Sequence, residues 1–459
     1  MNSIHSPRLL GTAIVAGILS WSPPLAAETD EEPSYRPEVV DFALDNGLEV
    51  VVIPDRRAPV VTHMLWYKVG SADEEFGHSG YAHFVEHLLF KATENYEAGE
   101  FSRQVAEVGG RENAFTSYDY TGYFQQVAPD RLAAMMRFEA DRMVNLALTE
   151  EVVLPELQVV IEERVQRIDN DPGAMLGEAI NATLYPHHPY GVPIIGWMHE
   201  IEEMNLEGAE EFYERHYAPN NAVLIVAGDV EADEVRVMAE ETYGQIPPNE
   251  AIVERQRVSE PPMAASRTVT LRDERVGTPS VSMYWQVPSY SMAEPGEAEA
   301  IDLLAAVIGD GVRSRLHQSL IVDQGIAASA GAYYRGTSVD MTSFVLYGTP
   351  RGDATVEDVE EALLAELRRV VDDGIAEREL EATKRRFIRS MIFARDSQSG
   401  MARMFGASLT TGSSVEDVLD WPDRVQDVTP EAVRAAAEQY LLDSPAVTGY
   451  LLPTEQEPS

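Results

Sequence analysis

The sequence has 459 residues, with 44% hydrophobic and 24% charged residues. These values indicate a folded globular protein with more than one domain, and they exclude a disordered, fibrous or multi-span membrane protein. The formal charge of -42 argues against nucleic acid or an anionic membrane as a partner. Because the acidic residues are spread along the chain, we interpret the charge as an adaptation for solubility; attraction of basic peptides is the alternative. The chain has no cysteine, so any transition metal must be held by His, Asp or Glu.

Residues 1–27 predict a secretory signal peptide. Arg8 precedes an apolar stretch over residues 9–21, and small residues and prolines then lead to Ala27. The stretch is short for a membrane span, although an uncleaved N-terminal anchor is the alternative. Without a cysteine or a twin arginine, Sec-type export without a lipid anchor is expected. We therefore expect a periplasmic or secreted protein with no membrane span after cleavage, beginning with a flexible leader over residues 28–38.

Residues 39–246 predict a first domain that mixes helices and strands. Two apolar runs flank Asn46-Gly47, which is a strong signal for a strand pair. The helical spacing of apolar residues and the runs of β-branched and aromatic residues predict the remaining elements. Helices are expected over residues 80–93, 101–110, 131–148 and 150–167, strands over residues 60–71 and 220–230, and a strand or hairpin over residues 112–127.

Residues 247–266 contain four prolines and little periodicity, which predicts a linker. After it the order of elements starts again, over residues 267–454. Strands are expected at 267–274, 279–289 and 342–350, and helices at 296–311 and 356–373.

The two ends of this pattern resemble each other. Residues 212–226 and 436–452 both read as a helix, a tyrosine, a short turn, Ala-Val and a strand. We infer a duplicated unit. The predicted fold class is α+β, with two homologous α/β-sandwich halves that form a clam shell around a chamber.

Three polar side chains stand out in the apolar stretch of residues 80–93. His83 and His87 are four residues apart, so on a helix both imidazoles lie on one face and can bind one zinc ion. Glu86 lies beside that face, where its carboxylate can take a proton from a zinc-bound water and pass it to the leaving amine. This His-x-x-Glu-His pattern is typical of inverzincin metallopeptidases.

A zinc hydrolase needs a third protein ligand. The acidic helix over residues 150–167 is the best source, because Glu156 and Glu163 lie two turns apart on one face. Glu162 is rotated from Glu163 by about 100°. Only one of these two side chains should point inward, and periodicity alone does not choose between them.

Several of these motifs resemble the pitrilysin family of zinc metallopeptidases, in its short two-domain bacterial type. The resemblance rests on HFVEHLLFKAT, on GGRENAFTSYDYTGYF and on HPYGVPIIGW. In that family the distal ligand follows the second histidine after 75 residues, which here is Glu163, and an acid seven residues earlier is Glu156. The resemblance covers essentially the whole mature chain.

The resemblance implies one zinc ion per chain, bound by His83, His87 and Glu163, with Glu86 as the general base. Glu156 would support a ligand from behind. It also implies an edge strand to which an extended peptide substrate adds through main-chain hydrogen bonds. The substrate-binding residues of that strand would be Asn113, Ala114, Phe115 and Thr116.

The second half departs from the family pattern. It has no His-x-x-Glu-His, and the family's substrate-steadying Arg and Tyr fall on Ile321 and Ala328. The nearby Tyr333, Tyr334 and Arg335 are out of register for a simple replacement. Loss of one oxyanion donor can lower the rate by about 10²–10³-fold. We therefore expect a dimer, in which a homologous subunit without zinc, or a second copy of this chain, supplies the missing groups.

The sequence thus predicts an exported zinc metalloendopeptidase that hydrolyses unfolded peptides. One alternative is a non-catalytic scaffold subunit on the same fold. Another is a peptide-binding module that holds zinc only for structure.

Overall fold

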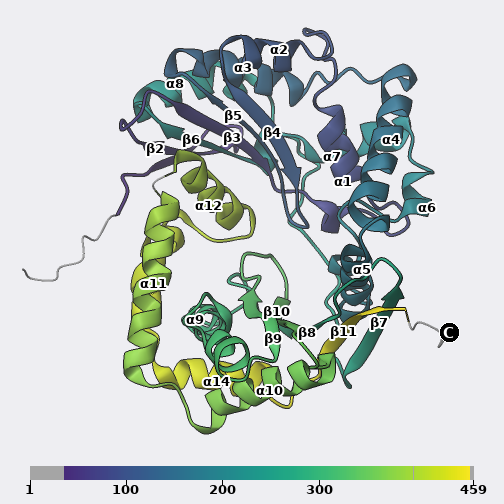
Figure 1. Ribbon diagram of the computed structural model, residues 1–459. Coiled ribbons are helices and arrows are strands. Elements are labelled where there is room, and N and C mark those ends of the chain that lie inside the picture. Colours follow the sequence, from purple (N-terminus) through teal and green to yellow (C-terminus); the bar gives the residue numbers. More distant parts are fainter. Residues whose placement is uncertain (1–35, 396, 455–459) are drawn as a thin grey trace, which may run out of the picture. The chain divides into compact units, whose positions relative to one another are not determined.

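The computed structural model describes residues 36–395 and 397–454, so the predicted signal peptide at 1–27 and residues 28–35 of the leader lie outside the described residues. From Pro37 on, the described residues form one compact unit, drawn in Figure 1. None of the described helices is long and apolar enough to cross a membrane.

The first sheet has the strand order β1-β2-β6-β3-β5-β4. β2 and β6 are parallel, and the other neighbouring strands are antiparallel. Gly47, at φ 87°, turns the chain between β1 and β2, as the Asn-Gly pair predicted. The strands are β1 Val40–Ala43, β2 Glu49–Pro54, β3 Val61–Tyr67, β4 Arg111–Thr116, β5 Thr121–Val127 and β6 Ala222–Gly228.

The second sheet repeats this topology. Its order is β7-β11-β8-β10-β9, with β7 and β11 parallel and the remaining pairs antiparallel. The order and directions match β2-β6-β3-β5-β4 strand for strand, which confirms the duplicated α+β halves. The strands are β7 Arg267–Asp273, β8 Ser280–Val287, β9 Ala327–Tyr334, β10 Thr342–Pro350 and β11 Val447–Pro453.

Helices surround both sheets, and all the helices predicted from the sequence are present. Residues 247–266 contain no helix or strand. The α-helices before this segment are α1 Tyr81–Leu88, α2 Glu100–Glu107, α3 Leu132–Arg142, α4 Glu150–Arg164, α5 Pro172–Leu184, α6 Met198–Ile201, α7 Leu206–His216 and α8 Ala232–Glu241. Those after it are α9 Glu297–Gly309, α10 Val356–Asp372, α11 Glu377–Arg395, α12 Gln398–Thr410, α13 Val415–Asp427 and α14 Pro430–Tyr440. π-helical turns occur at Val165–Asp169 and His317–Asp323.

Each half contributes one helix to the sheet of the other half. α5 packs on β7 and β11, and α12 packs on β3 and β6 (Figure 1). The contacts are close, since a Cβ on Gly406 of α12 would lie 2.0 Å from the Trp66 ring. Each sheet is therefore packed against one helix that comes from the other side of residues 247–266 in the sequence.

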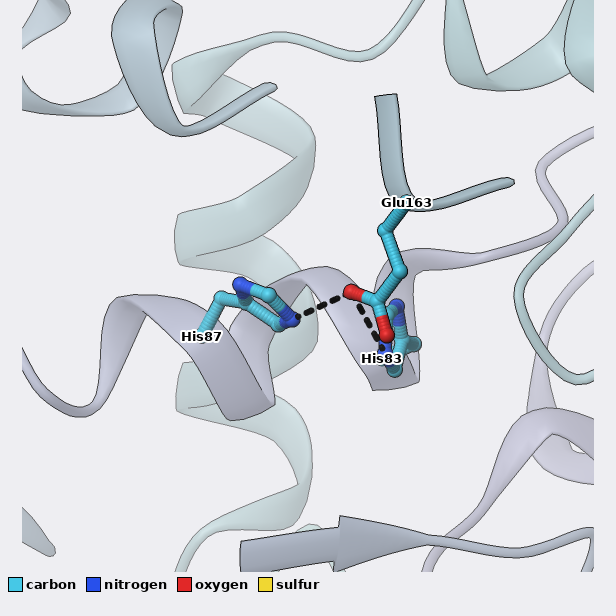
Figure 2. A group of neighbouring side chains, drawn as sticks. All are labelled: His83, His87 and Glu163. Carbon is cyan, nitrogen blue, oxygen red and sulfur yellow. Dashed lines mark ion pairs between the residues drawn. The ribbon is translucent and has the colours of Figure 1, made fainter. Parts of the chain in front are cut away.

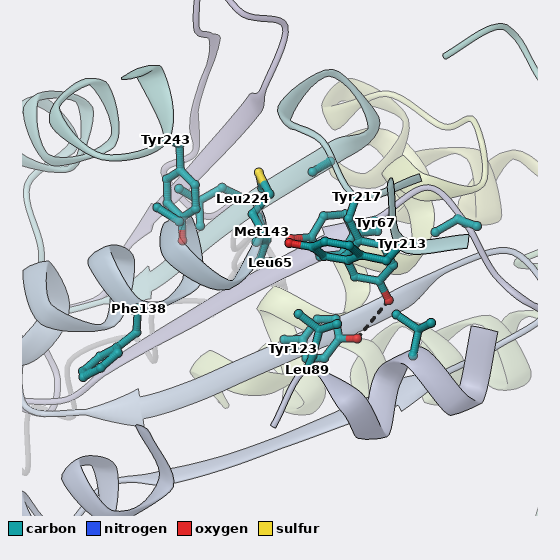
Figure 3. Close-up of a cluster of buried hydrophobic side chains, with 14 of the residues drawn as sticks. Leu65, Tyr67, Leu89, Tyr123, Phe138, Met143, Tyr213, Tyr217, Leu224 and Tyr243 are labelled. Atoms are coloured by element: carbon teal, nitrogen blue, oxygen red, sulfur yellow. Dashed lines mark hydrogen bonds between the residues drawn. The ribbon is translucent and has the colours of Figure 1, made fainter. Parts of the chain in front are cut away.

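The core of the first half holds α1 against the sheet. Aromatic side chains from β3, β5 and α7 meet beneath this helix (Figure 3), with the Tyr123 and Tyr217 hydroxyls 2.9 Å apart. Phe84, Val85 and Leu88 of α1 are fully buried. Burying each such side chain contributes roughly 1.5–3 kcal/mol to the free energy of folding. This burial fixes the rotation of α1, and with it the direction of its polar face.

Candidate metal centre

The start of α1 is anchored by a buried carboxylate. Gly80 precedes the helix at φ 98°, and the Glu74 carboxylate accepts hydrogen bonds from the backbone N–H of Gly80 at 2.8 Å and of Ala82 at 2.7 Å. These bonds satisfy donors that a helix start leaves free. The anchor lies one turn before His83, so the first histidine stands on a rigid element.

α4 brings a glutamate to the two histidines of α1. The Glu163 Oε2 atom lies 3.2 Å from Nε2 of His87 and 3.8 Å from Nε2 of His83 (Figure 2). Glu162 is exposed to solvent. The structure thus places Glu163, and not its neighbour, beside the histidines, as the family spacing predicted.

This donor set fits a zinc ion. Within the described part of the chain, these three residues form the group able to hold a metal, and one ligand atom from each lies within 4.8 Å of the others. Ligand atoms of a tetrahedral zinc site lie about 3.3 Å apart, which is close to both histidine–glutamate distances. Burial, with the nearby His87 and Arg167, lowers the pKa of His83 to about 3, so its imidazole is neutral. A neutral imidazole is the form that binds a metal.

Glu156 lies behind His87 and orients it. The Nδ1 atom of His87 is 2.9 Å from one carboxylate oxygen of Glu156, and Lys91 contacts the other at 2.5 Å. Burial alone would lower the pKa of His87, but the bond to Glu156 and the charge of Glu163 outweigh it and raise this pKa. Because Nδ1 is occupied, Nε2 is the atom that faces Glu163.

Glu86 lies on the same face of α1, beside the edge strand β4. Its Oε2 atom accepts a hydrogen bond of 2.6 Å from the Thr116 hydroxyl. Burial raises the pKa of Glu86, and the Thr116 bond opposes this rise. Thr116, the last residue of β4, thus holds the Glu86 carboxylate at the end of this strand.

Two cations at this centre were not predicted from the sequence. Arg167 contacts Oε1 of Glu163 at 2.6 Å, and Lys91 contacts Glu156. Arg167 follows Glu163 by four residues, and Lys91 follows His87 by four residues. Helical i,i+4 spacing could therefore have indicated the pair of Arg167 with Glu163. It could not have indicated the pair of Lys91 with Glu156, because Lys91 follows α1 and Glu156 lies on α4.

A cavity of about 960 Å³ opens on the centre. Its walls include His83, Glu86, His87 and Glu163, together with the four predicted substrate-binding residues. These four residues, Asn113 to Thr116, lie on β4 at the edge of the first sheet. All the residues lining the cavity fall between positions 83 and 195, so in the described structure the second half contributes none of them.

The two positions where the family pattern fails lie away from this cavity. Ile321 is in the π-helical turn His317–Asp323, and Ala328 is exposed on β9. Arg335 follows β9, with its guanidinium 5.6 Å from the centre of the Tyr333 ring. None of these residues lines the cavity.

Comparisons with known proteins decide the family. The family model "Insulinase (Peptidase family M16)" matches residues 49–197, and "Peptidase M16 inactive domain" matches residues 203–387. A zinc protease of Helicobacter pylori, PqqE, is 31% identical over 422 residues, which are 92% of this chain and 94% of that protein. The chain belongs to peptidase family M16.

Further similar proteins agree with this assignment to the family, which is also called the pitrilysin family. An uncharacterized zinc protease of Mycobacterium leprae is 32% identical over 87% of this chain and 88% of its own length. The crystal structure of a protease from Helicobacter pylori superimposes with a TM-score of 0.86 at 30% identity, over 91% of this chain and 100% of that chain. The first half of the periplasmic protease PqqL from Escherichia coli has the same fold, with a TM-score of 0.77 at 21% identity, over 90% of this chain and 92% of that chain.

Proposed function

We propose that this M16 chain is an exported zinc metalloendopeptidase that hydrolyses unfolded peptides. The observation that carries the proposal is the meeting of His83, His87 and Glu163 beside Glu86, at the end of the edge strand β4. A zinc ion bound there would polarise the peptide carbonyl and lower the pKa of a water molecule.

The chain's own residues would perform the remaining steps. β4 offers its free backbone edge, so an extended peptide can pair with it regardless of its side chains. Glu86, held by Thr116, would take a proton from water and deliver it to the leaving nitrogen. Glu156 would hold the His87 ring in place through Nδ1.

We expect the full active site to include a second subunit. Family members steady the substrate with an Arg and a Tyr, and this chain has Ile321 and Ala328 at those positions. The cavity lining supports this proposal, since none of it comes from the second half. A homologous zinc-less subunit, or a second copy of this chain, would supply the groups. The proposal fails if the purified chain alone cleaves a peptide as fast as it does when mixed with a zinc-less homologue.

Export to the periplasm is proposed from the signal-like residues 1–27. A protein of the same fold, PqqL of Escherichia coli, is described as a periplasmic protease, which supports this location.

Glu86→Gln tests the mechanism. The amide keeps the shape of the side chain but cannot take a proton, so peptide hydrolysis should fall by about 10²–10⁴-fold. Zinc content, measured by mass spectrometry, should stay that of the wild type. The control is Glu162→Gln, an exposed neighbour of Glu163, which should leave both values unchanged. Hydrolysis by Glu86→Gln at the wild-type rate would contradict the mechanism.

A non-catalytic scaffold subunit is the second candidate function. Two observations favour it, namely the missing Arg and Tyr and the match of residues 203–387 to an inactive-domain model. It predicts no chelator-sensitive hydrolysis, with or without a homologous partner. The peptidase proposal predicts hydrolysis that a chelator stops and added zinc restores, whereas a purely structural zinc would bind without supporting hydrolysis.

A further inference from the structure

A second cavity, of about 310 Å³, lies among the helices of the second half. It is bounded by α9, α11, α12 and α13, and it shares no residue with the cavity at the metal centre. One part of the wall is apolar, formed by Phe387, Met391, Met404, Val418 and Trp421, and another part carries the hydroxyl groups of Thr337, Ser408, Thr411 and Ser413.

A carboxylate stands on this apolar wall. Asp302 lies on α9 between the fully buried Ile301 and Leu303, yet it is itself partly exposed and lines the cavity. Its Oδ2 atom accepts a hydrogen bond from the Tyr290 hydroxyl. The Tyr290 oxygen in turn accepts a bond of 2.8 Å from the indole N–H of Trp421, which fixes the direction of the phenol proton.

Asp302 has no cationic partner among the described residues. Arg424 also lines the cavity, but its guanidinium contacts Glu299 at 2.6 Å and the backbone carbonyl of Asp417 at 3.0 Å. Burial raises the pKa of Asp302 to about 7; the Tyr290 bond opposes this rise and the charge of Glu299 adds to it. A carboxylate that is largely removed from water and has no cation beside it is costly even with one hydrogen bond, so a ligand that brings a positive charge would offset part of that cost.

We propose that this cavity binds a primary amine carried on an apolar body. The ammonium group would lie against Asp302, and the body would pack on the Phe387–Trp421 wall, where the two ring centres are 5.2 Å apart. The volume is at the lower end of the range for small-ligand sites, about 300–1,000 Å³. The carboxylates of Asp302, Asp417 and Glu299 disfavour an anion, because Arg424 alone does not balance them.

Calorimetry on the purified full chain tests the proposal with matched probes. 2-Phenylethylamine should bind at least about tenfold more tightly than 2-phenylethanol or 3-phenylpropanoate, because only the amine brings a positively charged hydrogen-bond donor to Asp302. Asp302→Asn should weaken amine binding by at least about tenfold, a loss of about 1.4 kcal/mol. The control Asp310→Asn, at the exposed end of the same helix, should bind the amine like the wild type.

Two further arms complete the test. Ala407→Phe fills the cavity from α12, leaves Asp302 in place, and should abolish amine binding. The peptide Phe-Gly-Gly-amide distinguishes the source of the amine, because tighter binding of the peptide than of 2-phenylethylamine would assign the site to a peptide N-terminus and weaker binding to a free amine. Equal binding of amine and alcohol, wild-type affinity in Asp302→Asn or Ala407→Phe, or no amine binding at millimolar concentration would each overturn the proposal.

Discussion

At the scale of single residues, the candidate metal centre depends on which nitrogen each histidine presents. Glu156 occupies Nδ1 of His87, so this ring presents Nε2 to Glu163. His83 has no such support, because its Nδ1 is buried without a hydrogen-bond partner in the described structure. The orientation of His83 therefore depends on packing, whereas that of His87 depends on one carboxylate.

Replacing Glu156 by Gln should weaken zinc binding while leaving the three proposed ligands intact. Loss of a supporting carboxylate typically lowers metal affinity by about 10–100-fold, because the ligand ring is less basic and less well oriented. Competition with a chelator would measure this affinity. Glu151→Gln, at an exposed position of the same helix, is the control. An unchanged zinc affinity in Glu156→Gln would assign Glu156 to the surface pair with Lys91 alone.

The sequence predicted the residues of this centre unequally. His83, Glu86 and His87 are recognisable because helical spacing alone puts them on one side of α1. The choice of Glu163 over Glu162 needed the family spacing, because a helix face is set by packing that the sequence does not display. The bond from Thr116 to Glu86 joins residues 30 positions apart, and only the fold brings them together.

At the scale of elements, the edge strand β4 lies between helices from both halves. Thr116 faces α1 and bonds to Glu86, while Phe115 contacts Arg403 of α12, whose guanidinium is 4.7 Å from the centre of the Phe115 ring. Trp66 lies 4.8 Å from Phe115 and also meets α12 at Gly406. The second half thus supports the predicted substrate strand from behind.

Gly406→Ala should loosen this support. Its Cβ would lie 2.0 Å from the Trp66 ring, within the fully packed face between α12 and the first sheet. We expect a loss of about 1–3 kcal/mol in the free energy of unfolding, measured by chemical denaturation. Gly177→Ala is the control, since a Cβ in the middle of α5 meets nothing within 4 Å. It should stabilise the protein by roughly 0.5–1 kcal/mol. Equal effects of the two substitutions would contradict the close packing of α12.

Most of the strands were predicted from the sequence, but the helices α5, α11, α12 and α13 were not, nor was the packing of helices across the two halves. The strands β2, β3 and β6 are continuous buried runs, and α10 has a regular apolar stripe, so local patterns reveal them. α5 and α12 also have helical apolar positions, but these positions do not specify which sheet they cover. The packing of each helix on the sheet of the other half depends on close contacts, such as Gly406 against Trp66 and Gly449 against Ile180. These contacts form only in the folded chain.

At the scale of the whole molecule, one structural unit occurs twice, but the candidate metal ligands occur only in its first copy among the described residues. α9 follows β8 as α1 follows β3, yet α9 has no histidine and is almost wholly buried. The linker joins the halves through charge, because Arg257 contacts Asp73 at 2.7 Å and Asp119 at 2.5 Å in the first half, and Asp340 at 3.1 Å in the second. One half therefore carries the candidate metal centre, and the other half packs against that half.

The zinc content of the purified chain tests this account most directly. Mass spectrometry should find one zinc ion per chain in the wild type and in Glu162→Gln, and almost none in Glu163→Gln at the same free zinc concentration. That result would place the ion on His83, His87 and Glu163 in the first half. A wild type without zinc, or a Glu163→Gln variant that keeps its full zinc content, would contradict the account.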